Sequence, residues 1–227
     1  MATSAKEFIA GLRHKFRTHA CPENALHMKD YMRGQFDYYG IKTPARRQLV
    51  REHTADVGGL PETKILKQVA DQLWREPNRE MQYAAMELLF EREKQLTLAD
   101  IPALERMVTT KSWWDTVDFI SYKLVGRLLA RHPDQEAAVA RRMSASGNLW
   151  LVRVSLLFQL LRKRRTDEEL LAELILRHAD HPDFFIRKAV GWALRDYART
   201  APAWVRSFVK QNSNLSPLSV REALKNL

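Results

Sequence analysis

The chain has 227 residues, 45% of them hydrophobic, and its 37 Lys and Arg against 27 Asp and Glu give a net charge of +10 and a pI near 9.9. This length and apolar content suffice for a packed core and exclude a disordered chain. No apolar run reaches the roughly 18 residues of a membrane-spanning helix, and charged residues interrupt the N-terminal stretch where a signal peptide would be apolar. We therefore expect a cytoplasmic protein with no membrane contact.

The excess of basic residues indicates a polyanionic partner. Lys and Arg bind nucleic acid largely by releasing counterions from phosphates, and a pI above about 9 is typical of nucleic-acid-binding domains. A basic protein without such a partner is the alternative. Cys21 is the only cysteine and the seven histidines are scattered, so we expect no disulfide, no metal site and no cofactor.

Apolar residues recur at three- and four-residue spacings along most of the chain, which predicts an all-helical protein. In chain order, helix starts are predicted at Thr43-Pro44, at Asp100-Ile101-Pro102 and at Thr166-Asp167, since each places a capping side chain or an early proline before a periodic apolar run. Glycine and proline are scarce and no low-complexity linker is present. We therefore expect a single domain over residues 1–227.

Short segments of the chain resemble one another at a nearly constant spacing. The aligned positions, 33 to 36 residues apart, are Arg47, Tyr83, Asp118, Arg153, Lys188 and Arg221. A period near 35 holds two helices and their turns, and such a pair buries its apolar side only by stacking on its neighbours. The sequence therefore predicts an all-α, HEAT-like α-solenoid of stacked helical pairs.

The repeat places polar side chains in one row, because equivalent positions of successive repeats share a face of a solenoid. Arg47, Arg153, Lys188 and Arg221 would form a basic stripe on the concave surface, interrupted by Asp118. We expect this stripe to bind DNA. The alternative is a scaffold in which each basic residue pairs with a carboxylate of the neighbouring repeat, as HEAT-type repeats often do.

Two tryptophans are predicted to belong to a site. Trp114 precedes Asp118 by four residues, so the two side chains would share one helical face, and Trp192 follows Lys188 by four. Aromatic faces stack on bases or sugars and attract positive charge. The other tryptophans singled out are expected to be packing anchors: Trp74, Trp113 and Trp150.

Asp118 is the principal catalytic candidate, with Asp115 in support. The sequence contains no Gly-rich phosphate loop, no Gly-x-Ser-x-Gly elbow and no metal-ligand spacing. A carboxylate flanked by aromatic rings can stabilise an oxocarbenium ion and orient a water against it, as in glycoside hydrolysis.

Three long segments resemble the AlkD family of DNA alkylation repair glycosylases. They are Thr110 to Asp118 (TKSWWDTVD), Asn148 to Arg153 (NLWLVR) and Phe184 to Arg195 (FFIRKAVGWALR), and the likeness extends from Tyr31 to Ala223. The resemblance implies a monomeric HEAT-like solenoid that cradles duplex DNA and excises N3- or N7-alkylated purines in base excision repair. It also implies a nucleoid-associated protein.

By this resemblance, the family's catalytic carboxylate falls on Asp118 and its lesion-facing tryptophans fall on Trp114 and Trp192. Its DNA-contacting arginine corresponds to Arg153 and its N-terminal tyrosine to Tyr31. Some relatives lack these residues and bind DNA without excision, so their retention favours an active enzyme. Two other readings stay open: a non-catalytic DNA-binding solenoid, and a scaffold whose basic row meets an acidic protein partner.

Overall fold

The computed structural model describes residues 4–227, and these residues form helices and connecting turns with no β-strand among them. The helices fall into two compact units, Met1–Gln95 and Leu96–Leu227. The predicted all-helical class is confirmed, whereas the single domain over 1–227 stays a prediction. Over the described part of the chain, no helix is both long and apolar enough to cross a membrane.

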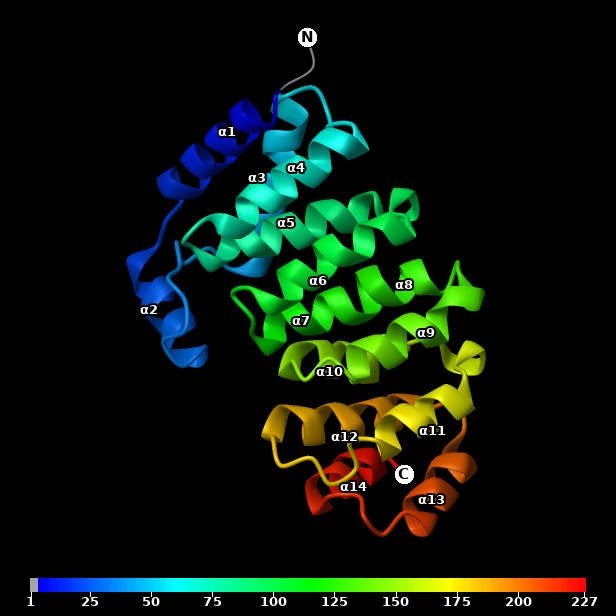
Figure 1. Cartoon of the computed structure of the whole chain (residues 1–227). Helices are drawn as coiled ribbons and strands as arrows, with labels where there is room; N and C mark the ends of the chain where they lie inside the picture. The colour runs from blue at the N-terminus through cyan, green and yellow to red at the C-terminus, as the bar shows by residue number, and fades with distance from the viewer. Residues whose placement is uncertain (1–3) are drawn as a thin grey trace. The chain divides into compact units, whose positions relative to one another are not determined.

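The first unit is built on an amphipathic N-terminal helix. Ser4 and Glu7 cap it reciprocally, since the Ser4 Oγ accepts from the Glu7 N–H and the Glu7 carboxylate accepts from the Ser4 N–H. Its buried face, which includes Phe8 and Leu12, packs on α3 and α4. The elements of this unit are α1 (Ala5–Thr18), α2 (Pro22–Tyr31), α3 (Thr43–Asp56), α4 (Thr63–Arg75), α5 (Arg79–Glu91) and the short turn η1 (Glu93–Gln95) (Figure 1).

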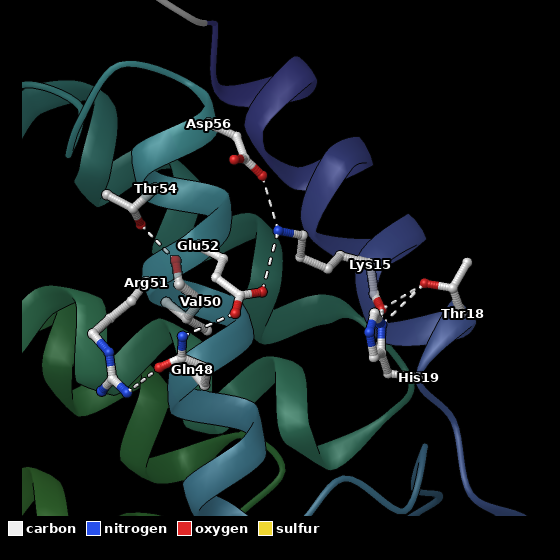
Figure 2. Close-up of polar contacts among 9 residues, drawn as sticks. All are labelled: Lys15, Thr18, His19, Gln48, Val50, Arg51, Glu52, Thr54 and Asp56. Carbon is white, nitrogen blue, oxygen red and sulfur yellow. Dashed lines mark hydrogen bonds and ion pairs between the residues drawn. The ribbon is translucent and has the colours of Figure 1, made fainter.

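Polar contacts join α1 to α3 at the surface and in the interior. Figure 2 shows the surface contact, in which Lys15 Nζ lies 2.9 Å from Asp56 Oδ2 and 3.6 Å from Glu52 Oε2. In the interior, the His53 Nε2 lies 2.7 Å from the Phe8 carbonyl oxygen, and burial lowers the pKa of this histidine. The buried contact fixes the packing, because exposed ion pairs are screened by water and contribute little.

A tight loop contacts the start of α2 at one side and the start of α5 at the other. The buried Glu80 carboxylate accepts hydrogen bonds of 2.8 to 3.1 Å from the backbone N–H groups of residues 39–41. Gly40 has a φ of +86°, and a Cβ there would lie 2.0 Å from the Cys21 carbonyl oxygen, so only glycine fits. This loop fixes the position of α2, whose last residue is Tyr31.

The second unit stacks helical pairs, and the repeat positions fall on the second helix of each pair. Helix α10 packs on α7 and on α12, and α12 packs on α14, so that α10 lies between α7 and α12 (Figure 1). These helices carry Asp118, Arg153, Lys188 and Arg221 in that order, which confirms the predicted stacking of pairs within the unit. The elements are η2 (Leu98–Asp100), α6 (Ile101–Thr109), α7 (Trp114–Phe119), η3 (Ile120–Val125), α8 (Gly126–Leu129), α9 (Pro133–Ser144), α10 (Leu149–Leu157), η4 (Lys163–Arg165), α11 (Glu168–Leu176), α12 (Phe184–Ala198), α13 (Pro202–Gln211) and α14 (Pro217–Leu224).

One continuous helix carries Asp118 and contains a π-helical turn. Elements α7, η3 and α8 follow one another without a break, and the π-helical turn η3 starts two residues after Asp118. Such turns occur frequently beside functional sites. At its end the helix closely approaches the segment after α10, since a Cβ on Gly126 would lie 2.0 Å from the Phe158 carbonyl oxygen.

This close approach predicts the effect of Gly126→Ala. The added methyl group would meet a backbone carbonyl that cannot swing away, so we expect the free energy of unfolding to fall by about 2 kcal/mol or more. Urea denaturation measures the change. An alanine in an open helix would instead stabilise by up to about 1 kcal/mol, so an unchanged or higher midpoint would contradict the packing described.

Candidate functional site

A buried ion pair between Asp118 on α7 and Arg153 on α10 lies at the centre of the site. The Arg153 Nε donates to Asp118 Oδ1 at 2.6 Å, and its Nη2 donates to Oδ2 at 2.8 Å. The two residues are only 8% and 4% exposed. The remaining Nη1 donates to the carbonyl oxygen of Phe185, at the start of α12. One guanidinium therefore joins three neighbouring helices.

Opposing influences act on the Asp118 carboxyl. Burial raises its pKa, and the negative charge of Asp115 adds to that rise, while the paired guanidinium of Arg153 lowers it. A carboxylate has about four acceptor positions, so the two bonds from Arg153 leave each oxygen able to accept a water or face a cation. The arrangement can therefore hold a water and stabilise positive charge.

An aromatic cluster covers the starts of the three helices. The ring centroids of Trp113, Trp150 and Phe185 lie 5.1 to 5.9 Å apart in tilted or edge-on arrangements, and all three side chains are half-buried. Trp113 and Trp150 thus pack on each other, as the sequence indicated, and Trp74 is buried elsewhere. The sequence did not reveal Phe185, whose ring completes the cluster and whose carbonyl holds Arg153.

The two tryptophans predicted for the site lie on either side of α10. Trp114 begins α7, one turn before Asp118, and Trp192 is on α12; both are half-buried. Tyr122, one turn after Asp118, is a further neighbour: burial raises the pKa of its phenol, and the negative charge of Asp118 adds to the effect. The catalytic roles assigned to Trp114 and Trp192 stay predictions.

Most of the basic residues in the predicted row have carboxylate partners one repeat away. Lys188 Nζ lies 2.8 Å from Glu222 Oε1, and in the first unit Arg47 Nε lies 2.9 Å from Glu87 Oε1. Together with the pair of Arg153, these contacts match the scaffold alternative in the unbound protein. Their contacts with DNA stay predictions.

The other two predicted DNA contacts are exposed. Arg221 on α14 forms no ion pair with any residue from 4 to 227. Tyr31, in the first unit, is 71% exposed at the end of α2. Both side chains are accessible to a ligand from solvent.

Comparison with known proteins assigns the chain to a family. A family model described as "DNA alkylation repair enzyme" matches residues 12–227. The chain belongs to the DNA alkylation repair enzyme family. A solved structure described as a "predicted DNA alkylation repair enzyme from Enterococcus faecalis" is 34% identical, with a TM-score of 0.84, over 92% of this chain and 96% of that chain. No curated protein matches the sequence.

Membership of this repair family gives the protein a role in DNA alkylation repair, with DNA as the substrate. In the part of the repair enzyme that the structure describes, no group of three or more His, Cys, Asp or Glu residues could hold a metal ion. The ionisable groups around the Asp118 carboxyl include the guanidinium of Arg153, the carboxyl of Asp115 and the phenol of Tyr122.

We expect removal of either partner of the buried pair to destabilise this repair enzyme strongly. Arg153→Ala leaves the Asp118 charge buried without a partner, which costs about 3 to 5 kcal/mol of unfolding free energy. Asp118→Ala has a similar cost, and the double variant should lose clearly less than the sum of the two. Urea denaturation of the four proteins measures this coupling.

A matched control is Arg142→Ala, which breaks an ion pair of similar length at the surface. Arg142 Nη2 lies 2.6 Å from Glu105 Oε1, but its side chain is 56% exposed, so we expect a loss below about 1 kcal/mol. Strictly additive losses at residues 118 and 153 would contradict a coupled buried pair.

Proposed function

We propose that the protein is a monofunctional, monomeric DNA glycosylase of base excision repair, acting on the chromosome in the cytoplasm. Its substrates would be N3- or N7-alkylated purines in duplex DNA, and it would hydrolyse their N-glycosidic bond without a metal or cofactor. Asp118 is the catalytic carboxylate, Trp114 and Trp192 face the lesion, and Arg153, Lys188, Arg221, Arg47 and Tyr31 contact the duplex.

The observation that carries this proposal is a buried carboxylate paired with a guanidinium and set one helical turn from Trp114. Most buried carboxylates of repeat proteins serve packing alone. Here, however, a cluster of aromatic side chains surrounds the start of the same helices, and the family acts on alkylated DNA. These features suit a substrate whose reacting sugar becomes positively charged.

The proposed reaction needs a single acidic residue. Alkylation at N3 or N7 makes the purine cationic, so the base leaves with the electron pair of the C1′–N9 bond as a neutral molecule and needs no protonation. Positive charge moves to the deoxyribose, where the Asp118 carboxylate and the electron-rich face of Trp114 stabilise it. A water oriented by Asp118 attacks C1′ and loses a proton, which leaves an abasic site.

The proposal predicts that Asp118→Asn slows base release. Asparagine keeps the shape of the side chain but removes the negative charge, so we expect the single-turnover rate of 7-methylguanine release from alkylated duplex to fall on the order of a hundredfold. Chromatography of the released base measures both proteins under the same conditions.

The same assay separates the two readings of the family. Equal rates for the two proteins would remove Asp118 from catalysis. If neither protein releases the base although both bind the duplex, the non-catalytic DNA-binding reading holds. Far-UV circular dichroism of both proteins would confirm that they are equally folded.

Arg153 is predicted to control the pH range of the reaction. Its guanidinium lowers the pKa of Asp118 against the raising effect of burial, so in Arg153→Gln that pKa rises. The carboxylate is then protonated, and inactive, at higher pH, and the acidic limb of the release rate against pH should move to higher pH. Arg153→Lys keeps a positive charge and should move it less. An unmoved limb in the glutamine variant would show that the pair does not set the ionisation of Asp118.

A further inference from the structure

The second unit carries a dense group of cations at the far end of α10 from its aromatic cluster. Lys163, Arg164 and Arg165 form the short turn η4 after α10, and Arg199 follows α12; all four side chains are exposed. We name these four residues the basic cluster. With Leu161, Arg162 and Thr200 they line an open cleft of about 560 Å³, and no carboxylate lines it.

The basic cluster differs from several exposed arginines of this unit in having no anionic partner. Arg141 and Arg177 both pair with Glu173, at 2.7 and 3.4 Å, and Arg142 pairs with Glu105. Within residues 4–227, in contrast, no carboxylate pairs with a side chain of the basic cluster. Like charges held close together repel, so this arrangement is unfavourable until an anion joins it.

The loop that presents the basic cluster is tied at both ends. Gln159 bonds the backbone of Asp167 twice, accepting from its N–H at 2.8 Å and donating to its carbonyl at 3.2 Å. Arg162 bonds Glu136 at 2.6 Å and the carbonyl of Gly126 at 2.7 Å. These bonds hold the backbone of the loop in place, so binding of an anion there needs little further backbone ordering.

The backbone of this loop adopts a conformation that its residues disfavour. Leu161 and Lys163 have φ values of +66° and +56°, in the left-handed region that non-glycine residues rarely enter. The Leu161 N–H is anchored on Asp196 Oδ2 at 2.8 Å, and its side chain is 57% exposed beside the cleft. Strain of this kind is retained mainly at ligand clamps and active sites.

We propose that the basic cluster binds phosphates of the substrate duplex away from the lesion and so forms a second contact with the same DNA. This inference rests on the proposed function, since it assigns another contact to the duplex that the Asp118 site acts on. Helix α10 ends at Leu157, four residues beyond Arg153, and Leu161 follows four residues later, so the two lie at most roughly 20 Å apart at 1.5 Å per helical residue and up to about 3.6 Å per residue beyond the helix. One duplex, with a rise of about 3.4 Å per base pair, can therefore reach both sites.

The test compares two triple variants with equal loss of charge. Lys163→Gln/Arg164→Gln/Arg165→Gln removes three unpaired cations, and Arg141→Gln/Arg142→Gln/Arg177→Gln removes three that are paired with Glu173 or Glu105. Fluorescence anisotropy with an unmodified 20-base-pair duplex is measured at several salt concentrations, and thermal unfolding checks that both variants are folded.

For the first variant we expect a Kd for the duplex raised roughly tenfold or more near 0.1 M salt. The slope of log K against log salt should also become shallower by about 0.9 for each phosphate that the variant no longer neutralises. The second variant should change both quantities clearly less, because its arginines are already neutralised. If both variants change the Kd and the salt slope equally, net charge alone explains binding and the inference is wrong. It is also wrong if the first variant binds the duplex with an unchanged Kd.

Binding of an unmodified duplex requires no base release, so the result is independent of the glycosylase assignment. If the glycosylase assignment is wrong, the protein releases no 7-methylguanine but still binds DNA through the basic cluster. If the present inference is wrong, the unmodified protein releases the base and the first variant binds the duplex as tightly as that protein does.

Discussion

The bidentate pair between Asp118 and Arg153 is the interaction on which the site depends. Neither charge is favourable in the protein interior alone, and each is retained because the other neutralises it. The same guanidinium bonds the carbonyl of Phe185 and so links α7, α10 and α12. A well-packed apolar pair at these positions is often at least as stable, so stability alone does not account for two buried charges. The proposed catalytic use of the Asp118 carboxylate accounts for their presence.

Much of the fold could be predicted because the helical-pair repeat determines which helices adjoin. The spacing of 35 residues placed Asp118, Arg153 and Lys188 on successive packed helices, and the structure has them on α7, α10 and α12. The sequence could not show whether these side chains form a basic stripe open to solvent or pair with carboxylates of the neighbouring repeat. A long arginine can reach either solvent or a neighbouring carboxylate from the same backbone position, and only the full packing decides between them.

Other features of the site left little or no signal in the sequence. A backbone carbonyl such as that of Phe185 can accept a hydrogen bond whatever the residue type. The π-helical turn after Asp118 is marked by neither proline nor glycine within it. The run from Arg162 to Arg165 is visible in the sequence as a charge cluster. The sequence does not indicate that Arg162 is half-buried and paired with Glu136, nor that Leu161 and Lys163 on either side of it have left-handed backbone.

A basic protein faces a conflict if it stabilises positive charge on a sugar. The cations that attract DNA phosphates would oppose an oxocarbenium ion if they stood unpaired beside it. The distribution of charge resolves the conflict: the carboxyl of Asp118 is influenced by one guanidinium and by the second carboxyl of Asp115, and Lys188 is neutralised by Glu222. The unpaired basic cluster stands at the other end of α10, where attraction of phosphate has no such cost. Under the proposed function, this separation of the paired cations near Asp118 from the unpaired basic cluster lets the same unit hold a polyanion and favour a cationic transition state.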